Sequence, residues 1–590
     1  MCFGFSSESK NTVKSYAEDG DYYTVLFTVF IDDNRHRTFC ISVIIKNVAD
    51  DGSGTITNYN FRFLLFGKKR ESKFYLSCCI CYLLAGLYTV PWLVCWETYR
   101  TLYLSACLIG IITFANLIRT GLLSEQHLSY GLIGIAIVHI IYMAMQYLGL
   151  VASGNAFFRI TGSNENPTTT ALFLTGIIPF LVARMRERKN PVFHIILLII
   201  FLLGIFSLRC RTAYIGVIVI FCYYAITNHY VQTHVFSLLK RHMFLSSAVI
   251  IVVSATGVYK MYTMKQDSAD GRLLVWKLSA EMIKDNPLGY GYGMFEKYYN
   301  LKQSDYFDAF GGTRQERDNA THVSMAYNDY LEHGIEGGVV GAIFLIGFYV
   351  LFAMLSFRHK LRDVTPVLIS FSVMSLMNFV IQGIQPWGIV CICSGLILSR
   401  DIFNPKYTVV RFKGFIPHPI IIVVSAAIMI KTFSLISSQY TLSHNVSKMK
   451  DNKTVSDNEF AEAEKNISTS EAFWFYRAKN SIRHGNYPKA EIYLKNALQF
   501  SSSPDKFFLM YRICLKQKLE YKGIKYLSYV SNMNPCHLYP KLLLMRYYDN
   551  HSDTGTARLY ANDILNTKVK NPSTKSQFIQ YEAYQYLCKH

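Results

Sequence analysis

The chain has 590 residues, and 60 Lys and Arg against 40 Asp and Glu give it a net charge of +20. Charged residues make up 17% of the chain and hydrophobic residues 51%, whereas charged residues are about 25% of a soluble domain. This composition excludes an entirely soluble enzyme and a disordered chain. Long apolar runs fill the middle of the sequence, so we expect an all-α polytopic membrane protein with a soluble C-terminal part.

Residues 1–66 precede the first long apolar run. Two runs rich in β-branched and aromatic residues, 22–31 and 38–46, flank a polar segment, which predicts a β-hairpin. Neither run reaches the roughly 20 residues that a spanning helix needs. We interpret 1–66 as a small cytoplasmic β unit, with an over-extended start site as the alternative. Met1 is not followed by a basic and then an apolar segment, so no cleavable signal peptide is predicted.

About eleven membrane spans are predicted in the membrane domain, residues 67–437. Their approximate limits are 74–96, 101–118, 130–150, 170–185, 192–208, 212–227, 243–259, 337–357, 365–381, 386–399 and 418–437. If the basic residues at 68–73 are cytoplasmic, most Lys and Arg of the short loops are cytoplasmic too. This orientation places a large loop, 260–336, and everything after 437 in the periplasm. It also explains the positive charge without nucleic acid.

A linker at 438–469 leads to a polar region, 470–590, that carries a weak helical repeat. The residues that fit a tetratricopeptide unit are Trp474, Ala478, Gly485, Asn486, Tyr487, Ala490, Leu494, Ala497 and Pro504. Weaker copies end at Pro535 and Pro572, close to the ~34-residue period. We predict about three degenerate repeats, with an irregular helical domain as the alternative. Such repeats offer a concave surface for a protein partner.

The periplasmic loop contains the most informative segments. Asp270 is a predicted N-cap for a helix that ends before Pro287, and Arg272 and Trp276 share one face of this helix. That amphipathic face suits the membrane surface or the lid of a cavity.

Three glycines, Gly289, Gly291 and Gly293, alternate with other residues directly after this helix. Glycine permits unusual backbone angles and close approach of a ligand. The run can cradle a phosphate, although a turn is the commoner explanation.

Arginines recur in the outward-facing loops at Arg100, Arg159 and Arg211. Snorkelling to lipid headgroups explains Arg100 best. For Arg211, in a tight turn beside other polar loops, snorkelling and ligand binding weigh about equally. Because the guanidinium fork binds phosphate bidentately, an outward cavity with several arginines fits an anionic, diphosphate-bearing lipid.

Residues 74–437 resemble the O-antigen ligase superfamily, whose members include O-antigen ligases, O-antigen polymerases and bacterial protein O-oligosaccharyltransferases. Four segments carry the resemblance: Arg272 and Trp276 followed by Asn286-Pro-Leu-Gly-Tyr-Gly-Tyr-Gly-Met-Phe295; Asn328 followed by Gly338-Val-Val-Gly341; Arg211-Thr-Ala; and Thr161-Gly-Ser with Asn166-Pro167.

The resemblance implies a glycosyltransferase of the bacterial inner membrane that moves a glycan from undecaprenyl diphosphate to an acceptor hydroxyl, without ATP, metal or other cofactor. The acceptor is lipid A-core in a ligase, a growing glycan in a polymerase, and Ser or Thr of a protein in an oligosaccharyltransferase. The C-terminal repeats suit a polypeptide partner, so we favour the ligase or protein O-glycosylation type narrowly over a polymerase.

One position departs from the family pattern. The family's His before Asn328 is Tyr327 here, and that His is usually the base. His322 is the favoured replacement, with Asp329, Tyr327, Glu332 and a mechanism without a strong base as alternatives. His333 lies close by but is better explained as a polar cap.

The resemblance therefore implies that Arg211 and Arg272 bind the diphosphate and that His322 is the general base. The other expected substrate-binding residues are Arg159, Asn328, Tyr327, Asp329, Trp276, Gly291 and Gly293. Two other classes of protein remain as alternatives. A lipid-linked sugar transporter predicts ionisable residues deep in the spans, and few are present. A membrane scaffold leaves the arginine- and glycine-rich loop unexplained.

Overall fold

The computed structural model describes two strands near the N-terminus, isolated positions between 107 and 118, and most of residues 121–590. The main gaps in the last part fall within 188–190, 236–265 and 402–436. The predicted span 74–96 lies outside the described residues, as do most of the spans 101–118, 243–259 and 418–437.

The two strands are β1 (Phe27–Asp32) and β2 (Thr38–Val43). They pair antiparallel, with Phe27 opposite Val43. Strand β2 lies within the second run whose composition predicts a hairpin, and β1 extends one residue beyond the first. Every other regular element that the structure describes is helical.

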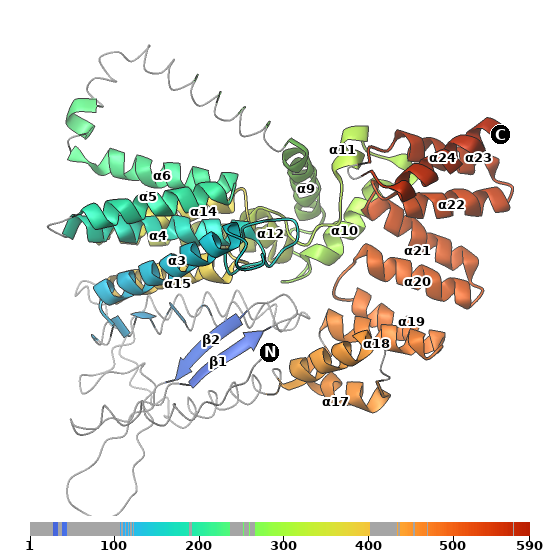
Figure 1. Cartoon of the computed structure of the whole chain (residues 1–590), viewed down its shortest axis with the longest axis horizontal. Helices are drawn as coiled ribbons and strands as arrows, with labels where there is room; N and C mark the ends of the chain where they lie inside the picture. The colour runs from blue at the N-terminus through green and yellow to red at the C-terminus, as the bar shows by residue number, and fades with distance from the viewer. Residues whose placement is uncertain are drawn as a thin grey trace, which may run out of the picture.

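Apolar helices form a bundle on one side of the molecule (Figure 1). They are α3 (Glu125–Tyr147), α4 (Pro167–Glu187), α5 (Val192–Ser207), α6 (Arg211–Thr227), α13 (Gly338–Arg358), α14 (Val364–Ser375) and α15 (Ile384–Asp401). Among the described residues, α3, α4 and α13 are long and apolar enough to cross a membrane, whereas α5, α6, α14 and α15 are shorter apolar helices. These helices make the chain a membrane protein; the number of eleven spans stays a prediction.

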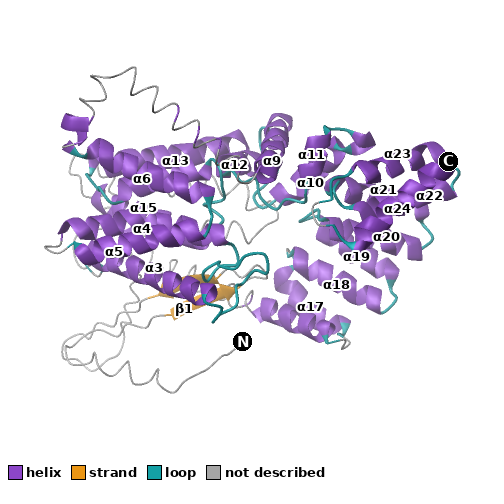
Figure 2. Cartoon of the chain, turned by 45° about the horizontal axis from the view of Figure 1, so that its top comes forward, coloured by secondary structure: helices purple, strands orange, loops and turns teal. Residues whose placement is uncertain are grey.

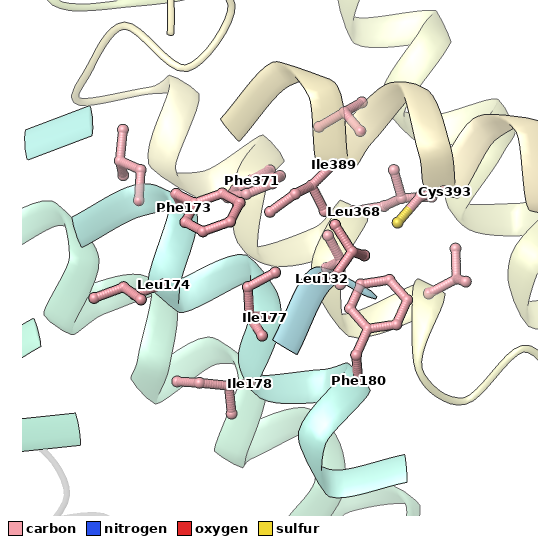
Figure 3. Packing of buried hydrophobic residues seen from close by; sticks show 14 of the residues in the cluster. Leu132, Phe173, Leu174, Ile177, Ile178, Phe180, Leu368, Phe371, Ile389 and Cys393 are labelled. Carbon is pink, nitrogen blue, oxygen red and sulfur yellow. The ribbon is translucent and has the colours of Figure 1, made fainter. Parts of the chain in front are cut away.

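Helix α4 is the centre of this bundle. It contacts α3, α5, α6, α14 and α15, and Phe173, Ile177 and Phe180 are buried on it (Figure 3). A Cβ atom on Gly176 would lie 2.6 Å from the ring of Phe371 on α14, so the two helices approach too closely for a larger residue. By contrast, α13 exposes apolar side chains such as Val340, as a lipid-facing helix does.

The described part of the predicted loop 260–336, here called the outer loop after its predicted location, folds into its own helical layer between the bundle and the C-terminal helices (Figures 1 and 2). Its elements are α9 (Gln266–Asp285), α10 (Phe295–Tyr306), a short 3-10 helix η4 (Asp308–Phe310), α11 (Arg314–Asn319) and α12 (Asp329–Glu336). The predicted N-cap is wrong, because α9 begins before Asp270, whose carboxylate instead accepts a hydrogen bond from Gln315 (2.9 Å). The predicted end of this helix before Pro287 agrees with α9.

The C-terminal region is a row of antiparallel helices. They are α17 (Asp457–Ile467), α18 (Glu471–Arg483), α19 (Tyr487–Leu498), α20 (Pro504–Lys516), α21 (Glu520–Met533), α22 (Leu538–Asn550), α23 (Thr554–Asn566) and α24 (Thr574–Lys589). Helices α18 and α19, α20 and α21, and α22 and α23 pack in successive pairs. Ala478 and Ala490 are fully buried where the first pair meets, because small side chains let helices approach. The pairs fall where the repeats are expected, and their assignment to the tetratricopeptide class stays a prediction.

Candidate active site

The N-termini of α4 and α6 lie side by side at one end of the bundle. Cys210, directly before α6, is in hydrogen-bond contact with the Thr168 hydroxyl in the first turn of α4. Arg209 has a left-handed φ of 49°, which makes the turn from α5 into α6 tight. Because each helix N-terminus carries a partial positive charge, this corner favours an anion, and Arg211 as the first residue of α6 adds a full charge to it.

Arg272 reaches the same corner from α9. Its guanidinium donates to the Met377 carbonyl between α14 and α15 (2.7 Å). The next residue, Asn378, donates to the hydroxyl of Thr212, which follows Arg211 (3.3 Å), so Arg211 and Arg272 face the same corner. Burial lowers the pKa of Arg272. Arginine nevertheless stays charged at neutral pH. The structure thus brings together the two residues predicted to bind diphosphate.

Tyr327 lies against Arg272. The Arg272 Cζ atom is 4.8 Å from the centroid of the Tyr327 ring, and Tyr327 has a left-handed φ of 53°. That conformation costs a residue with a Cβ atom about 1–2 kcal/mol. Strain of this kind occurs where the surroundings fix a functional side chain.

Trp276 and Glu332 hold the residue before Tyr327. The Trp276 indole donates to the Ala326 carbonyl (3.1 Å), and the Glu332 carboxylate accepts from the Ala326 amide (3.0 Å). The resemblance predicts that Trp276 binds substrate, and its observed contact fixes the backbone that presents Tyr327.

Asn328 and Asp329 fix the start of α12. The Asn328 side chain accepts from the amides of Tyr330 and Leu331 as the helix N-cap. The buried Asp329 carboxylate accepts from the amides of Val380 (2.9 Å) and Ile381 (3.3 Å). Burial, with a smaller effect of the nearby Glu332, raises the pKa of Asp329 to about 8. Both side chains therefore anchor backbone next to the arginine pair.

The glycine run packs against the C-terminal end of α12. The Gly291 amide donates to the Glu336 carbonyl (2.9 Å) and the Gly293 amide to the Glu336 carboxylate (3.0 Å). A Cβ atom on Gly289, which has φ of 88°, would lie 2.4 Å from the Gly338 nitrogen. The amides of Gly291 and Gly293 are thus used within the protein, so close packing explains the run better than a phosphate cradle does.

His322 and Arg159 have different surroundings. His322 Nε2 lies 3.3 Å from a carboxylate oxygen of Glu296 on α10, and Ser501 of the C-terminal region donates to the same oxygen (2.6 Å). Arg159 donates to the Tyr147 carbonyl (2.7 Å) and lines an open hollow of about 450 Å³ at the end of α3. These contacts place neither residue against the Arg211–Arg272 pair.

Two contributors to the site escape the sequence reasoning. One is the linker between α14 and α15, where the Met377 carbonyl meets Arg272 and the Asn378 amide donates to the Thr212 hydroxyl (3.3 Å). The other is Gln146, buried in α3, which lines the Arg159 hollow and shapes the loop before α4: its side chain bonds to both amides of the Thr161–Gly162 turn (2.9 Å each). A buried amide side chain inside an apolar run is the signal that could have found Gln146.

Residues 165–346 match the family model described as O-antigen ligase. This segment of the membrane domain therefore supports the O-antigen ligase superfamily, as the motifs predict. The matched segment runs from just before α4 into α13 and includes Arg211, Arg272 and Tyr327. No curated protein matches the chain. The family makes the chain a membrane glycosyltransferase of the O-antigen ligase or polymerase type, which acts on a lipid-linked glycan.

Proposed function

We propose that this enzyme transfers a glycan from undecaprenyl diphosphate to an acceptor hydroxyl, with Arg211 and Arg272 binding the diphosphate. The observation that carries the proposal is that Arg211 begins α6 beside the N-terminus of α4, and that Arg272 binds Met377, next to the Asn378 side chain that donates to Thr212. Each of these features attracts a phosphate. The bacterial inner membrane, with the loop and the C-terminal helices in the periplasm, is the setting that this substrate requires.

The proposed chemistry is a displacement at the anomeric carbon. The acceptor oxygen forms a bond to C1 of the glycan while the bond from C1 to the phosphate oxygen breaks, and the lipid diphosphate leaves with the electron pair. The developing negative charge falls on the phosphate oxygens, where fixed cations stabilise it. The leaving diphosphate stores the free energy of transfer, so the step needs no ATP.

A residue must accept the proton that the acceptor hydroxyl loses, and Tyr327 and His322 are the two candidates. Tyr327 occupies the position of the family's His and contacts Arg272. The His322 Nε2 atom lies 3.3 Å from a carboxylate oxygen of Glu296, and the contacts of His322 in the described structure do not include Arg211 or Arg272. We therefore propose that Tyr327 contacts the acceptor hydroxyl. Comparing the transfer activity of Tyr327→Phe with that of His322→Ala decides which residue accepts the proton.

The favoured acceptors are lipid A-core and the Ser or Thr hydroxyl of a protein. The C-terminal helices contact the loop that carries Arg272 and Tyr327, so a partner bound to these helices would be near the proposed site. Transfer to a growing glycan is the competing outcome of an acceptor screen.

Binding of the donor can be tested without knowing the acceptor. Purified protein in detergent is titrated with undecaprenyl diphosphate, comparing wild type with Arg211→Ala and Arg272→Ala. Arg546→Ala is the matched control, because Arg546 forms an ion pair with Glu582 (2.6 Å) in the C-terminal helices. We expect weaker binding in the first two variants alone. Unchanged binding in both would remove the diphosphate assignment.

A further inference from the structure

Gln303 on α10 connects the outer loop to the C-terminal helices through hydrogen bonds. Gln303 is 1% exposed, and its side-chain nitrogen donates to two carbonyls, Met533 at the end of α21 (2.8 Å) and Thr321 in the loop (3.1 Å). The Tyr299 hydroxyl donates to its oxygen (2.9 Å). One buried amide thus joins the C-terminal region to the start of the segment that leads to Tyr327.

A second set of contacts joins α11 to α23 of the C-terminal region. Arg317 lies 3.4 Å from the carboxylate of Asp563 on α23, which also pairs with the buried Lys541 (2.6 Å). Arg314 donates to the Asn566 carbonyl (2.9 Å). Helix α11 ends at Asn319, directly before the same segment.

A third contact joins α10 to the turn before α20. Ser501 donates to Glu296, and the buried Lys506 donates to the Ser501 hydroxyl (2.9 Å). The three contacts are spread along α10 and α11, so they fix both the position and the orientation of these helices.

The segment 320–328 has no helix or strand of its own. Its backbone is held by side chains at successive points: Thr321 by Gln303, Val323 by Asn300 through two hydrogen bonds (2.9 and 3.1 Å), and Ala326 by Trp276 and Glu332. Its conformation therefore depends on where α10 lies, and the strained Tyr327 follows directly.

We propose that the C-terminal helices are a built-in brace for the active site, and that Gln303 and Arg317 are positioning residues that act through segment 320–328 on Tyr327. This inference rests on the proposed function for its effect on catalysis. The brace acts on Tyr327, whereas Arg272 is also held by the Met377 carbonyl, outside segment 320–328. We therefore expect the brace to set the rate of transfer and to leave donor affinity unchanged.

The test compares hydrogen exchange and kinetics of the full-length protein in detergent. Gln303→Met removes both donated hydrogen bonds and keeps the side-chain volume. Arg317→Ala loosens α11 and leaves Asp563 paired with Lys541. Gln517→Met is the matched control, because Gln517 precedes α21 at the end opposite Met533. Unchanged exchange in α4 and α18 verifies that each variant is folded.

We expect faster exchange of the 320–328 amides in Gln303→Met and Arg317→Ala, with kcat lowered about 10- to 100-fold, the KM for the lipid donor unchanged, and no effect in Gln517→Met. Unchanged exchange of 320–328 in both folded variants overturns the brace, and so does faster exchange with an unchanged kcat. If wild type shows no transfer, the proposed function fails separately, and the exchange data alone decide whether the brace holds the segment.

Discussion

The Arg272 guanidinium lies over the ring of Tyr327, with 4.8 Å between Cζ and the ring centroid. This contact joins α9 to segment 320–328, and a cation–π pair of this kind contributes about 0.5–2 kcal/mol. Arg272, a proposed diphosphate ligand, is therefore in contact with Tyr327, which occupies the position of the family's His.

Arg272→Lys keeps the charge but should lower transfer roughly 10- to 100-fold, because a lysine cannot donate to Met377 and bind a phosphate with a planar fork. Initial rates at subsaturating lipid donor measure this loss. Arg546→Ala serves as the control for a general effect of removing an arginine. An Arg272→Lys enzyme with the wild-type rate would show that charge alone suffices.

Tyr327→Phe keeps the ring under Arg272 and removes the phenol. If Tyr327 contacts the acceptor hydroxyl, kcat should fall by about 10-fold or more, with donor affinity unchanged. His322→Ala measures the competing assignment. If Tyr327→Phe is fully active and His322→Ala is inactive, His322 is the general base.

Gly289→Ala should lower the free energy of unfolding by about 2 kcal/mol or more. The new Cβ atom would lie 2.4 Å from the Gly338 nitrogen, on a backbone with φ of 88°. Gly347→Ala is the matched control, since nothing lies within 4 Å of a Cβ atom there. Thermal unfolding in detergent should show a lower midpoint for Gly289→Ala only, and equal midpoints would refute the packing explanation of the glycine run.

Asp329 should make stability depend on pH. Its pKa is about 8 in the folded protein against an ordinary value of 3.8, so between these values the folded state binds the proton more tightly than the unfolded state. Stability from this group is therefore full below about pH 4, falls as the pH rises, and is lost above about pH 8.

Asp329→Asn mimics the protonated carboxyl and should flatten this dependence. Unfolding midpoints measured from pH 6 to 9 test the difference between the variant and wild type. Parallel curves for the two proteins would show that Asp329 titrates normally.

The apolar helices that the structure describes and the end of α9 could be predicted from the sequence, and so could the placement of Arg211 and Arg272 at the same corner; their role in binding diphosphate stays a proposal. Helix periodicity and hydrophobicity are local signals, and the family motifs link α6 to α9. The left-handed φ of Tyr327 could not be predicted, because the backbone before it is held by Trp276, about 50 positions earlier in the sequence, together with Glu332.

The surroundings of His322 were also beyond sequence reasoning. Its neighbour Glu296 is 26 positions away, and Ser501 belongs to another region of the chain. Likewise, the bond from Gln303 to Met533 spans 230 positions. Such contacts form only when the outer loop and the C-terminal helices pack together. A local sequence pattern cannot predict them.

The most direct test of the central claim is a transfer assay in proteoliposomes. Wild type, Arg211→Ala, Arg272→Ala and the Arg546→Ala control receive an undecaprenyl-diphosphate-linked glycan and either lipid A-core, periplasmic protein or free glycan. We predict acceptor-dependent release of undecaprenyl diphosphate by wild type and Arg546→Ala, and its loss in the other two variants. Equal release by all four proteins, or no transfer to any acceptor by folded wild type that binds the donor, would contradict the assignment.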